Sequence, residues 1–109
     1  MQNLLHVFMI KVTNDELKLI DKVEKAVCEY FLVKPQEVVN SNRTAQVSLA
    51  RGYIFYILHV DYKLSIGKLV SVFFRKKRVI NWNVSKIKFL LKQRIYKDIY
   101  NNICKSLSM

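Results

Sequence analysis

The chain has 109 residues and a net charge of +11, half of its residues are apolar, and it contains only two glycines and one proline. The length indicates one domain, residues 1–109, with a modest core, and the apolar half excludes wholesale disorder. The scarcity of turn residues favours helices over a sheet. We therefore predict an all-α, compact helical bundle of about five helices.

The positive charge is unevenly distributed along the chain. Residues 1–37 sum to −1, whereas residues 38–109 sum to +12. Such a concentration of Lys and Arg is typical of a protein that binds a polyanion. Charge alone does not distinguish a nucleic acid from an anionic membrane surface.

The remaining ionisable residues indicate no metal and no cofactor. Cys28 and Cys104 are isolated, and His6 and His59 have no neighbouring ligands, so we expect reduced thiols and no metal site. No apolar run reaches the roughly 18 residues that span a bilayer. The start of the chain lacks the basic region and cleavage site of a signal peptide. We expect a cytoplasmic protein without a membrane or small-molecule partner.

The first predicted helix begins after Thr13. Residues 1–12 are apolar without a clear period, which leaves a strand, an extended arm and an added helical turn open. Thr13-Asn14-Asp15-Glu16 has the form of a capping box, and the apolar spacing that follows predicts an amphipathic helix over 15–32. Pro35 then predicts one short helical turn over 35–39.

A long helix is predicted next, from about Thr44 to Val60. Its apolar side chains spread so widely around the axis that we expect it to be the central helix. Arg43 precedes it in a polar loop, and Arg51 lies in the middle of its apolar sequence.

Residues 65–93 have the pattern of a helix-turn-helix. Ser65 is a predicted N-cap, and apolar residues follow it at i, i+3, i+4 and i+7 spacing. A second apolar stripe begins at Ile80, with four consecutive cations between the two stripes. Two apolar stripes joined by a cationic corner fit two packed helices. A charge run of this kind is also common as a solvated corner.

The second helix of this motif has a polar face. Asn81, Ser85 and Lys88 lie opposite the stripe that begins at Ile80. The major groove of a duplex admits one helix and exposes base edges to it. In that arrangement the cations of the corner would meet the phosphates on either side.

The C-terminal extension, 94–109, continues this helix, either unbroken or with one break. Trp82, Phe89 and Tyr96 form a row at seven-residue intervals. We interpret the row as core, because this spacing suits a helix buried on two sides. The alternative is that the row, or the tail from Arg94, binds a protein partner or a second copy, which leaves a homodimer open.

Between residues 41 and 87, Arg43 stands eight residues before Arg51 in Leu49-Ala50-Arg51-Gly52, Ser65-Ile66 stands fourteen residues after Arg51, and Lys86-Ile87 lies beyond the basic corner. This region resembles the C-terminal duplex-DNA-binding domain of the bacterial replication initiator DnaA, a Trp-repressor-like helix-turn-helix domain. In that family a loop arginine stands eight residues before an arginine at the start of a helix, a Ser-Leu helix start follows fourteen residues later, and a Lys-Ile pair follows the recognition segment.

The resemblance implies that Arg43 enters the minor groove and that Arg51 binds a phosphate; an ordinary helix-surface cation is the alternative for Arg51. The family's Gly-Gly-Arg-Asp-His-Thr-Thr-Val signature is absent. Its place is taken by the basic segment 74–80, which is one residue shorter if Lys86-Ile87 is kept in register. Because acceptors and methyl groups are replaced by cations, we expect a different sequence preference and more backbone affinity.

These observations predict a stand-alone, nucleoid-associated protein that binds double-stranded DNA, in replication or transcription control. The alternative is a helical interaction or dimerisation module. An enzyme is not expected, because no nucleophile, base and orienting group fall together. The predicted DNA-binding residues are Arg43, Arg51, Lys68, Arg75, Lys76, Lys77, Arg78, Asn81, Ser85 and Lys88.

Overall fold

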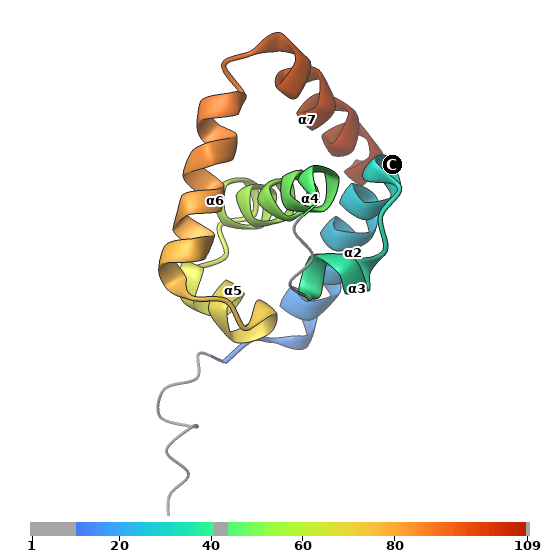
Figure 1. Cartoon of the computed structure of the whole chain (residues 1–109). Coiled ribbons are helices and arrows are strands. Elements are labelled where there is room, and N and C mark those ends of the chain that lie inside the picture. The colour runs from blue at the N-terminus through green and yellow to red at the C-terminus, as the bar shows by residue number, and fades with distance from the viewer. Residues whose placement is uncertain (1–10, 41–43, 109) are drawn as a thin grey trace, which may run out of the picture.

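The computed structural model describes residues 11–40 and 44–108, which form α-helices and no strand (Figure 1). The six helices are α2 (Asn14–Phe31), α3 (Pro35–Val39), α4 (Ala45–Tyr56), α5 (Ile66–Phe73), α6 (Lys77–Leu90) and α7 (Arg94–Leu107). The all-α prediction is confirmed, with one helix more than the five expected.

The sequence left the structure of residues 1–12 undecided, and residues 1–10 of this segment lie outside the described residues. No described helix is long and apolar enough to cross a membrane.

Local signals account for the start of the first helix. The Glu16 amide donates to Thr13 Oγ1 (3.1 Å), and the Thr13 amide donates to Glu16 Oε1 (3.0 Å), which is the predicted capping box. Val23 and Val27 of α2 are fully buried. The helix ends at Leu32, whose φ of 56° is left-handed.

Helix α4 is the centre of the molecule, as predicted. Its Tyr53, Ile54 and Phe55 have no exposed surface, and Figure 1 shows the other helices arranged around it. The Tyr53 hydroxyl donates to the Tyr96 carbonyl (2.7 Å), which ties α4 to α7. The helix continues beyond Tyr56 as a turn of π-helix, Ile57–Asp61.

Helix α6 packs closely on α4. Gly52 of α4 allows this approach, because a Cβ atom there would lie 3.0 Å from Cδ1 and Cγ1 of Ile87. Ile80, Asn83 and Ile87 form the buried side of α6. The contact fixes which side of α6 faces solvent.

The chain breaks once between α6 and α7, which settles the alternative that the sequence left open. The break lies at residues 91–93, after which α7 turns back toward α2 (Figure 1). Ile103 and Leu107 are buried, but 66% of Ile95 is exposed. The turn gives α7 an orientation of its own, which leaves Ile95 exposed at its start.

Candidate nucleic-acid interface

The corner between α5 and α6 is a three-residue turn, 74–76. Phe74 ends α5 in the left-handed conformation, with φ 54°, and is 83% exposed. Lys76 is the N-cap of α6, with extended backbone and no side-chain hydrogen bond to the helix. Lys77 and Arg78 follow in the first turn, and all three cations are exposed. The positive end of α6 therefore carries positive side chains and no acid.

The predicted polar face of α6 is on the surface. Asn81, Ser85 and Lys88 are exposed, whereas Ile80 and Ile87 on the opposite side are buried against α4. These are donors and acceptors of the kind that meet base edges. The structure therefore places the three side chains together on an open helix face, next to the cationic corner.

The aromatic row was predicted as core, and this is wrong for α6. Trp82 and Phe89 are each 62% exposed, because α6 packs on α4 through its other side. Lys86 Nζ lies 5.2 Å from the centroid of the Trp82 ring, and Lys92 Nζ lies 5.5 Å from that of Phe89. Each exposed ring therefore has an ammonium group beside it.

Two predicted DNA contacts, Arg51 and Arg75, have a structural role that the sequence analysis did not assign. Arg51 is only 8% exposed, so the alternative of an ordinary helix-surface cation is wrong. It donates from Nε to the Val38 carbonyl (2.9 Å) and from Nη2 to the Asn40 carbonyl (3.1 Å). Burial, followed by the charge of Arg75, lowers the pKa of its guanidinium.

Arg75 reaches the same end of α3 from the corner. Its Nη2 donates to the carbonyls of Val38 (3.1 Å) and Val39 (3.0 Å), and also to that of Asn40. The last carbonyls of a helix have no partner within it, and here Arg51 and Arg75 satisfy them. We call this arrangement the arginine clasp. A DNA contact by either arginine stays a prediction.

Lys68, the predicted backbone contact on α5, is also engaged within the molecule. Its ammonium forms an ion pair with the Glu16 carboxylate of α2. Hydrogen bonds from Lys68 and from the Thr13 amide hold the pKa of Glu16 below its usual value. This partner lies 52 residues away in the sequence, so no local pattern indicated it.

The predicted minor-groove residue, Arg43, lies outside the described residues. The residues that flank this loop are described. Thr44 caps α4 by accepting a hydrogen bond from the Val47 amide (3.3 Å). Asn40 accepts from both arginines of the clasp. Asn40, the last described residue before this loop, is therefore hydrogen-bonded directly to the α5–α6 corner.

A depression of about 500 Å³ lies between α4 and α6. Its lining comes from both helices and from the corner: Ser48, Arg51, Arg75, Val79, Trp82, Asn83 and Lys86. Of these residues only Arg51 and Arg75 were among the predicted site residues; Ser48, Val79, Trp82, Asn83 and Lys86 were not. Asn83 is buried and donates to the Val79 carbonyl (2.9 Å), and its position within the buried stripe of α6 was the signal that could have identified it. The described lining holds three cations and no acid.

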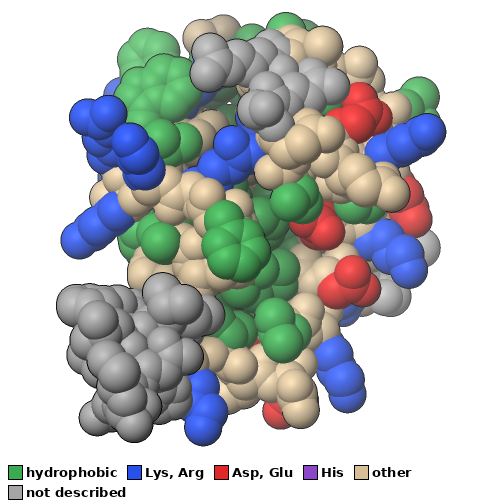
Figure 2. Space-filling view, turned by 60° about the horizontal axis from the view of Figure 1, so that its bottom comes forward, with side chains coloured by type: hydrophobic (Ala, Val, Ile, Leu, Met, Phe, Trp, Pro, Cys, Tyr) green, Lys and Arg blue, Asp and Glu red, His purple; other side chains and the backbone are tan. Residues whose placement is uncertain are grey.

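The charges separate across the molecule. Figure 2 shows acidic side chains mixed with basic ones on the side of α2, and basic side chains without acidic neighbours on the side of α6. The sequence has no Asp or Glu between Asp61 and Asp98. The surface of α5, the corner and α6 is therefore positive as a whole.

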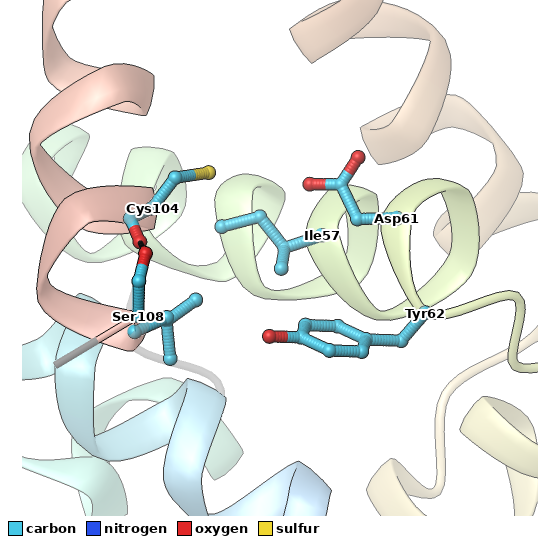
Figure 3. A pocket seen from close by; sticks show the side chains of 6 residues that line it. Ile57, Asp61, Tyr62, Cys104 and Ser108 are labelled. Carbon is cyan, nitrogen blue, oxygen red and sulfur yellow. Dashed lines mark hydrogen bonds between the residues drawn. The ribbon is translucent and has the colours of Figure 1, made fainter.

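A second, smaller hollow of about 260 Å³ separates the π-helical turn from α7 (Figure 3). It contains Asp61, Cys104 and Ser108, but Ser108 Oγ donates to the Cys104 carbonyl of its own helix (2.9 Å). Burial raises the pKa of the Cys104 thiol, which disfavours the reactive thiolate. Within the described part of the chain, no group of three or more His, Cys, Asp or Glu side chains is placed to hold a metal ion.

No family profile matches the chain, and no curated protein sequence is significantly similar to it.

Proposed function

We propose that this protein binds double-stranded DNA, with the α5–α6 corner on the phosphates and the polar face of α6 in the major groove. One observation supports this most strongly: the positive end of α6 carries Lys76, Lys77 and Arg78, exposed and without an acidic or side-chain cap. Each cation at such a helix end costs about 0.3–1 kcal/mol. A bound phosphate would supply the missing negative charge.

The face beyond the corner supports the same proposal. Asn81 and Ser85 can donate to and accept from base edges, and Lys88 can pair with guanine or with a phosphate. The resemblance to the DnaA domain points to the same pair of helices. We propose a role in replication or transcription control, with a recognition sequence unlike that of the initiator, because the signature residues differ.

The test is a duplex-binding titration by fluorescence anisotropy at several salt concentrations. Simultaneous change of Lys76, Lys77 and Arg78 to Ala should make the log-log salt dependence less steep by about two to three, since each phosphate contact contributes about 0.9. Arg75 stays unchanged because it holds α3. An unchanged slope in the triple variant would contradict the proposal.

The matched control removes the same charge from the other side of the molecule. Lys18, Lys22 and Lys25 are exposed on α2, which lies across the molecule from α6 in Figure 1. Their change to Ala should leave the salt slope within about half a unit of the original. A selection of duplexes from a random pool then separates base reading, which yields a motif, from phosphate affinity alone, which yields none.

A helical interaction module is the second candidate, favoured by the exposure of Trp82 and Phe89. Self-association through α6 would bring two chains of net charge +11 together, so it should strengthen as salt screens the repulsion. Light scattering at low and high salt tests it. A monomer at both salt concentrations excludes dimerisation through this face.

A further inference from the structure

The depression between α4 and α6 combines an aromatic wall with a positive lining. Trp82 forms the wall and remains 62% exposed. Lys86 stands beside it, 5.2 Å from the ring centroid. Arg51 and Arg75 add positive charge, although their donors serve the carbonyls of α3. Asn81 and Ser85 of the polar face do not line the depression.

We infer that this depression binds one nucleotide of a single-stranded nucleic acid, with its unpaired base stacked on Trp82 and its phosphate paired with Lys86. Proteins that hold single strands combine a positive groove with aromatic side chains on which bases stack. A volume of about 500 Å³ lies within the range typical of small-ligand sites. Ser48 and Asn83 line the same depression and supply polar contacts.

The positive charge of the lining favours a nucleotide over an apolar protein segment as the occupant of the depression. A protein helix docked on Trp82 would cover three cations without neutralising them, unless it were strongly acidic. A second copy of this chain brings +11 of its own. A nucleotide supplies a π face for the indole and a negative charge for the cations in one unit.

This inference deepens the proposed function, since it assigns the neighbouring surface to DNA whose strands have separated. The two can fail independently. Duplex binding depends on Lys76, Lys77 and Arg78, whereas stacking of an unpaired base depends on Trp82. Different variants and different probes therefore address each.

The test uses the full chain and its own fluorescence, because Trp82 is the single tryptophan. The probes are a thymidine dodecamer and an abasic oligonucleotide of equal length, which has the same phosphates but no bases. We expect saturable quenching of Trp82 by the thymidine probe and little quenching by the abasic one. Equal quenching and equal affinity for both probes would overturn the inference.

Variants supply the second readout, by anisotropy of labelled probes. Trp82→Ala should weaken binding of the thymidine probe by about tenfold and change binding of the abasic probe and of a duplex by less than about threefold. Lys86→Gln should weaken binding of both single-stranded probes. Phe89→Ala is the control, because this ring is equally exposed but does not line the depression. It should change none of these affinities more than twofold.

An unchanged affinity of Trp82→Ala for the thymidine probe overturns the inference, as does an equal loss for thymidine and abasic probes. Folding of the variant is checked by far-ultraviolet circular dichroism, which the loss of a largely exposed side chain should leave unchanged. Trp82→Phe keeps an aromatic face and should restore most of the affinity for the thymidine probe. A loss equal to that of the Ala variant would count against stacking.

Discussion

Replacing Lys76 by Asp should stabilise the fold and weaken DNA binding at the same time. Lys76 is exposed and occupies the N-cap of α6 with the extended backbone that a capping residue needs. An aspartate there can accept from the amide of Arg78 or Val79, which is worth about 1 kcal/mol. Its negative charge would also lie at the positive end of the helix dipole, which stabilises the helix by about 0.3–1 kcal/mol.

The sum, about 1.5 kcal/mol, corresponds to a rise in melting temperature of roughly 6 °C for a domain of this size. The same change should make the salt dependence of duplex binding less steep by about one. Thermal unfolding and anisotropy titrations measure the two effects. Lys76→Asn adds the cap without reversing the charge, and should give most of the stabilisation with a smaller loss of binding.

Two results would refute the reasoning about Lys76. A melting temperature that stays constant or falls would show that the N-terminus of α6 does not lack a cap in solution. A higher melting temperature with unchanged duplex affinity would show that the corner does not meet the phosphates.

Three further predictions concern the scaffold. Gly52→Ala should lower the free energy of unfolding by about 1 kcal/mol, because the added Cβ would lie only 3.0 Å from Ile87 and the cost of this crowding exceeds the gain in helix propensity. Urea denaturation measures the change, and a variant of equal or higher stability would contradict the prediction. Phe74→Gly should raise the free energy of unfolding by about 0.5–1 kcal/mol in the same assay, since the backbone of Phe74 is in the left-handed region and its ring is exposed. A lower stability would mean that the ring has a packing role. The lowered pKa of Glu16 stabilises the fold at pH values above the usual pKa of 4.5, and this stabilisation is lost as the pH falls through the folded-state pKa. Lys68→Met should therefore make the melting temperature less sensitive to acid between pH 3 and 6. An unchanged pH profile would contradict the pairing of Lys68 with Glu16.

The sequence predicted what local patterns determine. The capping box at Thr13, the N-cap Ser65 and the central helix around Tyr53 are all confirmed, because each depends on residues within one or two helical turns. The exposure of Asn81, Ser85 and Lys88 also followed from helical spacing alone.

The sequence did not predict contacts between distant segments. Lys68 meets Glu16 from 52 residues away, and Arg75 meets carbonyls more than 30 residues away, so both were interpreted as cations available to DNA. Trp82 was assigned to the core because apolar identity does not show whether a helix has a neighbour on its second side. The depression likewise depends on how α4 and α6 pack.

The arginine clasp affects how mutational data on this protein should be interpreted. Arg75→Ala would remove a positive charge and also the hydrogen bonds that join the α5–α6 corner to the end of α3. The Val39 carbonyl would lose its bond from Arg75, whereas the carbonyls of Val38 and Asn40 would keep their bonds from Arg51. Weaker DNA binding by such a variant would therefore not identify Arg75 as a phosphate ligand. An alanine scan would therefore rank Arg75 as a DNA contact even if its whole role were to hold the end of α3 against the α5–α6 corner.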